Sequence, residues 1–135
     1  MSSSNGSMGF VMDTSAWMEY FRKSSIGHRV AEYVDSEETL ITSTLVIAEM
    51  KRRYEQQGRS DFDEHISFIR DVSVVEPIVE EPIAILAGEI RQREAISGTS
   101  LIDCILIAMA RIGGHRVITK DTQFKVFHEA VVLEE

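Results

Sequence analysis

Four acidic residues lie where a carboxylate could do chemistry: Asp13, Glu49, Asp103 and Asp121. Asp13 and Asp121 each follow a short apolar run and precede a helix-like segment, a pattern typical of the carboxyl end of a parallel strand. Glu49 and Asp103 each interrupt an apolar helical segment. Four carboxylates in one pocket would repel one another without a cation, and all-oxygen ligation suits Mg²⁺ or Mn²⁺. The residue types therefore predict a divalent-metal site.

Asp103 is the most anomalous of the four acids. Residues 101–110, LIDCILIAMA, predict a helix that is apolar on every side and therefore buried. An ionised carboxylate removed from water shifts its pKa or requires a cation. The competing interpretation is an acid paired with Lys or Arg, or one on a partly exposed stripe of the helix.

The other three acids have simpler alternatives. Glu49 lies in the apolar segment 45–50, but it could instead form an exposed helix pair with Arg52 or Arg53, three and four residues later. Asp13 and Asp121 could each be a helix N-cap, since Asp is a favoured capping residue. The combination of the four acids, rather than any one of them, favours a shared pocket.

Alternating strands and helices would position these acids. The sequence predicts strands at 10–12, 40–42, 72–75, 117–119 and 131–133. It predicts helices at 16–23, 26–35, 45–57, from 62 onward, 82–96 and 101–112. This alternation favours one α/β domain with a mostly parallel central sheet of four to five strands flanked by helices. Ligands of such folds bind beyond the carboxyl ends of the strands.

Length and composition are typical of one cytoplasmic domain. The 135 residues are 44% hydrophobic, which is enough to fill one core. The longest apolar run, 105–110, is far shorter than the roughly 20 residues of a membrane-spanning helix. The single cysteine, Cys104, cannot form an internal disulfide, which favours a reducing location. Residues 1–8 are polar, and we interpret them as a disordered leader or expression scar before a domain at 9–135.

The net charge restricts how the protein could bind nucleic acid. Lys and Arg number 14 against 22 Asp and Glu, a net charge of −8, so phosphate binding requires a local basic patch and a metal. Arg52, Arg53 and Lys120 are candidates for contacts with nucleic-acid phosphates. The four histidines are scattered without the spacing of zinc ligands, which disfavours a zinc site.

Four short motifs resemble the signature of the PIN-domain family. They are MDTS at 12–15, IAE at 47–49, LIDCILIA at 101–108 and ITKD at 118–121. Their order and spacing are similar to those of the family, and the resemblance covers residues 9–133. In size the chain is similar to the stand-alone VapC-type toxins of prokaryotic toxin–antitoxin pairs.

This resemblance implies an Mg²⁺- or Mn²⁺-dependent endoribonuclease that hydrolyses RNA phosphodiester bonds. The four acids match the family's acidic positions, and Ser15 and Thr119 match supporting hydroxyls. The resemblance also implies a homodimer and a cognate antitoxin whose tail covers the active-site groove. In many relatives a further acid comes just after the position of Asp121, whereas Thr122 and Gln123 follow here. This departure favours one metal ion over two.

Other classes of protein are also compatible with acids at strand ends. A receiver-type phosphoacceptor domain would use a lysine such as Lys120, but it needs paired acids after its first strand. A haloacid-dehalogenase-like phosphatase needs Asp-x-Asp, whereas Asp13 is followed by Thr14 and Ser15. The remaining alternative is a catalytically silent PIN-like module that binds RNA or protein, against which the presence of all four acids argues.

Overall fold

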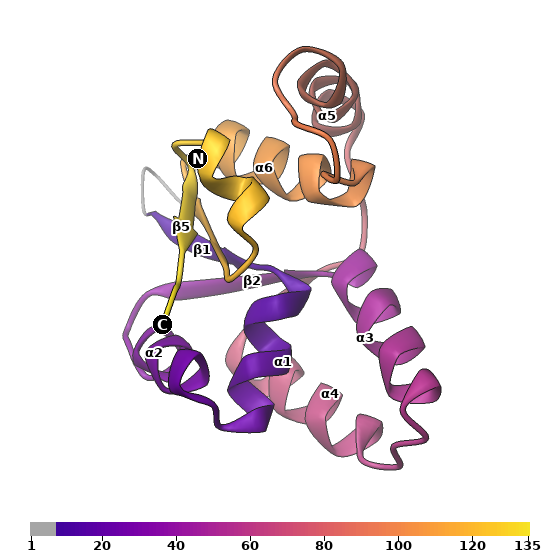
Figure 1. Cartoon of the computed structure of the whole chain (residues 1–135), viewed down its shortest axis with the longest axis vertical. Coiled ribbons are helices and arrows are strands. Elements are labelled where there is room, and N and C mark those ends of the chain that lie inside the picture. Colours follow the sequence, from indigo (N-terminus) through magenta and orange to yellow (C-terminus); the bar gives the residue numbers. More distant parts are fainter. Residues whose placement is uncertain (1–7) are drawn as a thin grey trace.

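A five-stranded parallel sheet forms the centre of the computed structural model, which describes residues 8–135 (Figure 1). Its strands are β1 (Gly9–Met12), β2 (Thr39–Ser43), β3 (Val74–Glu76), β4 (Arg116–Thr119) and β5 (Ala130–Val132). Their order across the sheet is β3-β2-β1-β4-β5, and every neighbouring pair is parallel. The predicted α/β domain with a parallel sheet of four to five strands is confirmed. Apart from Met8, the predicted leader lies outside the described residues.

Helices cover both faces of this sheet. On one face lie α1 (Thr14–Arg22), α2 (Ser25–Val34), α3 (Thr44–Gln56) and α4 (Phe62–Val72) (Figure 1). On the other lie α5 (Glu81–Arg93) and α6 (Leu101–Gly113), while the 3₁₀-helix η1 (Thr122–Val126) connects β4 to β5. None of the helices in residues 8–135 combines the length and apolar character that a membrane crossing requires.

The core lies between the central strands and the helices on either side. Val11 of β1 and Val117 of β4 are fully buried, as expected for parallel strands covered on both faces. Trp17 of α1 and Tyr54 of α3 are also fully buried. The Trp17 indole N–H donates to Thr42 Oγ1 of β2 at 3.1 Å, which satisfies its polar group inside the core.

Serine side chains fix the beginnings of several helices. Ser24 Oγ accepts a hydrogen bond from the Gly27 N–H at the start of α2, and Ser43 Oγ accepts one from the Leu45 N–H at the start of α3.

The strand predicted at 72–75 begins later than expected, because α4 continues through Val72. The Ser73 N–H and Oγ–H both donate to the Ile69 carbonyl, which closes the last turn of that helix.

Candidate active site

The fold collects the four predicted acids at one edge of the sheet. Asp13 directly follows β1 and Asp121 comes two residues after β4, the strand beside it. Helix α6 leads back to the start of β4, so Asp103 in its first turn lies at the carboxyl ends of the strands. Glu49 lies in the second turn of α3, which begins directly after β2. Parallel α/β sheets bind ligands at this edge.

Asp13 is a buried acid held by two hydroxyl groups. Its side chain is 3% exposed, and its Oδ2 accepts hydrogen bonds from Ser15 Oγ and Thr119 Oγ1, each at 2.7 Å. Burial raises its pKa to about 6, although the two hydroxyls act in the opposite direction. The nearby carboxylates of Asp121 and Asp103 contribute to this rise. A bound cation would remove the cost of ionising this group.

The same two hydroxyls connect Asp13 to the segment that carries Asp121. Ser15 Oγ and Thr119 Oγ1 lie 3.1 Å apart. Ser15 Oγ accepts from the Lys120 N–H at 3.1 Å, and Thr119 Oγ1 accepts from the Asp121 N–H at 3.0 Å. Both predicted supporting hydroxyls therefore lie against Asp13, and they also fix the backbone after β4.

Asp103 is less buried than its sequence context predicts. Its side chain is half-buried, because the first turn of α6 lies near the surface, where Leu101 is exposed, so the predicted burial of this part of the helix is wrong. Its Oδ2 accepts from the Ser100 N–H at 2.9 Å, and its own N–H donates to Ser100 Oγ at 3.0 Å. This capping box begins α6 at the predicted cap, Ser100, and the Ser-x-x-Asp spacing is the sequence signal for the reciprocal role of Asp103, which was not predicted.

The charged groups that affect the pKa of Asp103 are other carboxylates. Burial raises its pKa, and the carboxylates of Asp121 and Glu49 raise it further, against the hydrogen bonds from Ser100. Within residues 8–135 its carboxylate forms no ion pair with a Lys or Arg. Of the two alternatives for Asp103, pairing with a basic side chain is therefore wrong, whereas a partly exposed position on the helix agrees with the structure.

The structure disagrees with the alternative roles considered for the other three acids, a helix ion pair for Glu49 and N-caps for Asp13 and Asp121. Glu49 Oε1 accepts from Thr14 Oγ1 at 2.7 Å, and in the described chain it pairs with neither Arg52 nor Arg53. Asp13 and Asp121 occupy the N-cap positions of α1 and η1, but neither side chain makes the capping hydrogen bond. These carboxylates are therefore not used to begin helices.

The four acids at the carboxyl ends of the strands, the acidic edge, offer oxygen ligands suited to a hard cation, but they do not form a complete coordination site. Among the described residues, no three Asp, Glu, His or Cys side chains lie close enough together to hold a metal ion as they stand. The donor atoms nevertheless fit, because carboxylate oxygens are the ligands that Mg²⁺ and Mn²⁺ prefer. Both side-chain hydrogen bonds to Asp13 end on Oδ2, which leaves Oδ1 for another ligand.

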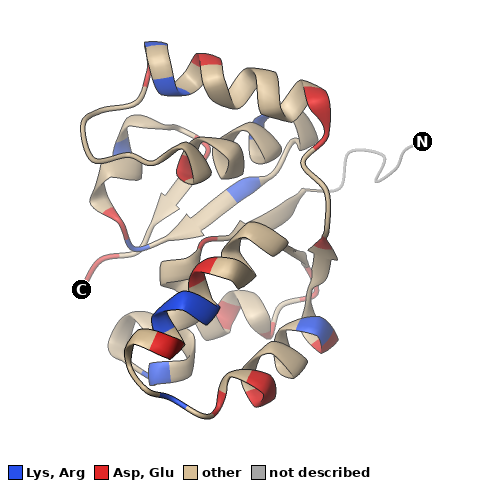
Figure 2. Ribbon diagram, turned by 90° about the vertical axis from the view of Figure 1, so that its right-hand side faces the viewer, with Lys and Arg blue, Asp and Glu red and all other residues tan. Residues whose placement is uncertain are grey.

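The predicted phosphate-binding residues differ in how free they are. The Lys120 ammonium forms an ion pair with Glu19 at 2.8 Å, so it is engaged within the protein. Arg52 is exposed and Arg53 half-buried, three and four residues after Glu49 on the same helix. Figure 2 shows Lys and Arg distributed over both helical layers rather than gathered in one stripe. Arg52 and Arg53 are thus the better placed of the three candidates.

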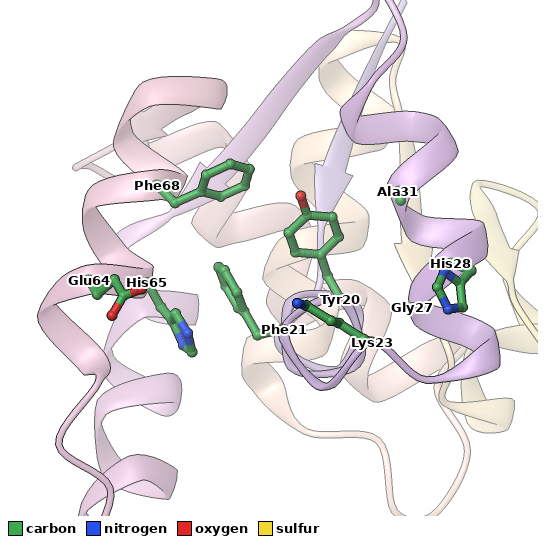
Figure 3. A pocket seen from close by; sticks show the side chains of 9 residues that line it. All are labelled: Tyr20, Phe21, Lys23, Gly27, His28, Ala31, Glu64, His65 and Phe68. Atoms are coloured by element: carbon green, nitrogen blue, oxygen red, sulfur yellow. The ribbon is translucent and has the colours of Figure 1, made fainter.

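A separate cavity of about 580 Å³ lies between α1, α2 and α4 (Figure 3). The Phe21 ring stacks on His65 with a centroid separation of 4.0 Å, and Tyr20 stacks on Phe68 at 5.5 Å. None of the four acids lines this cavity. Its lining residues are Tyr20, Phe21, Lys23, Gly27, His28, Ala31, Glu64, His65 and Phe68.

A parallel α/β domain with acidic residues at the carboxyl ends of its strands agrees with the PIN-domain resemblance of the sequence motifs. The family model of the PIN domain matches residues 10–129, so the chain belongs to the PIN domain family. Membership confirms the resemblance found in the sequence and, with it, the prediction of a nuclease. A comparison with curated proteins found no relative.

Solved structures with this fold include components of toxin–antitoxin systems. A chain of a toxin-antitoxin complex from Klebsiella pneumoniae has a TM-score of 0.75 at 16% identity, with 94% of this chain and 99% of that chain covered. VapC20 of Mycobacterium tuberculosis, a sarcin-ricin loop cleaving toxin, has a TM-score of 0.72 at 19% identity, covering 89% and 95%. VapBC2 of Rickettsia felis, bound to a promoter DNA fragment, has a TM-score of 0.70 at 14% identity, covering 93% and 98%. At such identities the likeness is one of fold.

Proposed function

We propose that this protein is an Mg²⁺- or Mn²⁺-dependent endoribonuclease and the toxin of a toxin–antitoxin pair that acts in the cytoplasm. The observation that carries the proposal is the buried Asp13 carboxyl, whose pKa is raised to about 6 by burial and by the neighbouring Asp121 and Asp103. Buried acids that raise one another's pKa are typical of functional sites. A divalent cation would offset this repulsion.

The proposed roles follow from the contacts of each side chain. Asp13 and Asp103 would bind the cation directly, and Asp121 and Glu49 would bind it directly or through water. A bound cation activates water, orients the phosphodiester and offsets charge on the phosphoryl oxygens. The hydroxyls on Asp13 Oδ2 hold that carboxylate in one orientation, and Thr14 holds Glu49.

The residues that follow Asp121 support binding of one cation rather than two. Asp121 is followed by Thr122 and Gln123, so no further carboxylate comes from η1 beside it. The phosphates of RNA would then lie toward Arg52 and Arg53, which follow Glu49 along α3. These residues contribute binding and orientation, whereas the four carboxylates contribute the metal site.

We propose an antitoxin whose tail covers the active-site groove, as the family resemblance implies, and which also occupies the aromatic cavity between α1, α2 and α4. One similar structure is a toxin-antitoxin complex, and another is VapBC2 bound to a promoter DNA fragment. The net charge of −8 favours a basic partner, and the rings of Tyr20, Phe21 and Phe68 favour an apolar side chain on it. As in the sequence-based expectation, we propose a homodimer as the form that binds it.

The product of the adjoining gene provides the test of this partner. Co-expressed with this chain, it should elute in one complex with it and suppress RNA cleavage. We expect a Phe68→Ala variant, which removes a ring from the cavity, to bind that product more weakly while its RNA cleavage is retained. Separate elution of the two proteins with undiminished cleavage would contradict the toxin assignment and leave the nuclease in place.

The nuclease itself is tested by Asp103→Asn. The rate of Mn²⁺-dependent RNA cleavage should fall at least about 100-fold. Loss of a residue that only orients a metal ligand costs up to about 100-fold, so a direct ligand should cost at least as much. Its fold should persist, because the amide oxygen can still accept the Ser100 N–H. The measurement is cleavage of a labelled RNA by the purified, folded variant with added Mn²⁺.

Ser100→Ala is the matched control, because it removes the other half of the capping box and keeps the carboxylate. We expect it to lose about 1 kcal/mol of stability and to retain cleavage. Undiminished cleavage by Asp103→Asn would refute the site assignment. A folded wild type that cleaves no RNA with Mn²⁺ would instead favour the catalytically silent alternative.

A further inference from the structure

Glu19 is a buried acid on α1 that the sequence did not single out. It is 6% exposed and accepts hydrogen bonds from three donors: Lys120 Nζ at 2.8 Å, Arg22 Nη1 at 2.6 Å and Ser24 Oγ at 2.6 Å. Burial would raise its pKa, but these donors outweigh burial and lower it to about 2. The side chain is therefore a fixed negative charge that joins α1, the start of α2 and the end of β4.

Its partner Lys120 lies directly before Asp121 and is held to α1 at two points. The Lys120 ammonium is bound by Glu19, and the Lys120 N–H donates to Ser15 Oγ, four residues earlier on the same helix. Ser15 in turn donates to Asp13. The residue between the end of β4 and Asp121 is thus clamped to the helix that begins at Asp13.

We propose that Glu19 is a positioning residue of the acidic site, which holds Lys120 against α1 and thereby keeps Asp121 within reach of a cation at Asp13. The inference rests on the proposed metal-dependent function. Residues that orient metal ligands from outside the coordination sphere set their geometry and so affect the metal's affinity. Glu19 touches neither metal nor substrate in this role.

The burial of Glu19 separates this ion pair from an ordinary surface pair. Exposed Lys–Glu pairs contribute little, because both side chains remain hydrated and mobile. Glu19 has three donors around a carboxylate that is withdrawn from water, so the Lys120 side chain, itself 37% exposed, has one fixed partner. Without that partner, the Lys120 side chain no longer holds the Asp121 segment, which is left with the hydrogen bonds to the Ser15 and Thr119 hydroxyls.

Glu129 is a matched control for a role in stability alone. It is also 6% exposed and accepts a hydrogen bond from Arg111 Nε at 2.8 Å. It precedes β5, at the amino ends of the strands, whereas the four acids lie at the carboxyl ends. Glu129→Gln therefore removes a buried charge of the same kind, and in residues 8–135 Glu129 forms no side-chain hydrogen bond or ion pair with Lys120 or with any of the four acids.

The experiment compares Mn²⁺ binding by isothermal titration calorimetry in the wild type, Glu19→Gln and Glu129→Gln. Each protein is first shown to be folded by circular dichroism. We expect both substitutions to lower the melting temperature, but only Glu19→Gln to raise the Mn²⁺ dissociation constant, by about 10-fold. A dissociation constant in Glu19→Gln equal to that of the wild type, or a rise of the same size in Glu129→Gln, would overturn the inference.

Lys120→Gln gives a second test that does not disturb the buried carboxylate, since Arg22 and Ser24 still bind Glu19. Electrostatics alone would tighten Mn²⁺ binding when a positive charge beside the site is removed. Loss of positioning weakens it, so we expect a higher dissociation constant, and equal or tighter binding would overturn the inference. A wild type that binds no Mn²⁺ would overturn the proposed function and this inference together.

Discussion

The pKa of Asp13 makes the stability of the metal-free protein depend on pH. A carboxyl whose pKa rises on folding binds its proton more tightly in the folded state, so folding loses stability as the pH rises. For Asp13 the window runs from its ordinary value of 3.8 to about 6. At about 1.4 kcal/mol per unit of pKa, the loss amounts to about 3 kcal/mol above that window.

Asp13→Asn should remove this loss. In EDTA at pH 7 we expect the variant to unfold at a higher urea concentration than the wild type, and at pH 4 we expect the difference to vanish. Added Mn²⁺ should stabilise the wild type more than the variant, because only the wild type keeps the charged ligand. Equal stabilisation of both proteins by Mn²⁺ would contradict a metal at Asp13.

Thr119→Val tests the hydroxyl that holds Asp13. The substitution keeps the shape of the side chain but removes a donor that favours the ionised carboxylate, so the pKa of Asp13 should rise further. Protons then compete with Mn²⁺ at higher pH. Mn²⁺ titrations at pH 6, 7 and 8 should show a deficit in affinity that shrinks as the pH rises. A deficit of the same size at all three values would assign Thr119 a purely structural role.

What the sequence could show about single residues depended on how local their surroundings are. Asp13 and Asp121 were placed correctly because a strand end is recognisable from its own few residues. Glu19 looks like an ordinary helix residue three positions before Arg22, and its partner Lys120 is 101 residues away. Its burial follows from the sheet order, which no local pattern contains.

Helices α1 and α2 approach each other at Gly27. A Cβ at this position would lie 2.1 Å from the Glu19 carbonyl oxygen, so Gly27→Ala forces the two helices apart. We expect a loss of about 3 kcal/mol or more in the free energy of unfolding, measured with urea. Gly88→Ala on α5 is the control: nothing lies within 4 Å of its Cβ, and we expect a gain of about 0.5–1 kcal/mol. Similar effects of both substitutions would refute the close approach.

The order of helices and strands was predictable because the apolar spacing changes sharply between them. Helix and strand boundaries were less predictable. Val72 resembles a strand residue, yet it ends α4 because Ser73 donates to the Ile69 carbonyl in the last turn of that helix. The burial of α6 was overestimated from composition, since apolar residues such as Leu101 and Ile112 are about half exposed. The cavity between α1, α2 and α4 depends on how three helices pack, which periodicity does not describe.

For the whole molecule, the net charge of −8 means that the proposed binding of RNA would rely on a few basic residues. Replacing Arg52 and Arg53 together by Gln should raise the KM for RNA about 10-fold, leave kcat nearly unchanged and weaken the salt dependence of KM. Arg91 and Arg93 on α5 form a matched pair in the other helical layer, and their replacement should change KM little. Equal increases in KM for both pairs would indicate binding by overall charge alone.

The two hydroxyls that share Asp13 Oδ2 also bear on which ions the protein would accept in a cell that contains several. A carboxylate with one oxygen already occupied contributes one ligand rather than two. Mg²⁺ accepts such single contacts in a compact octahedron, whereas Ca²⁺ takes about six to eight oxygens and readily draws on both oxygens of a carboxylate. At the proposed metal site the hydroxyl pair would therefore favour Mg²⁺ over the larger Ca²⁺, and we expect Ca²⁺ to bind weakly and to compete little with Mg²⁺.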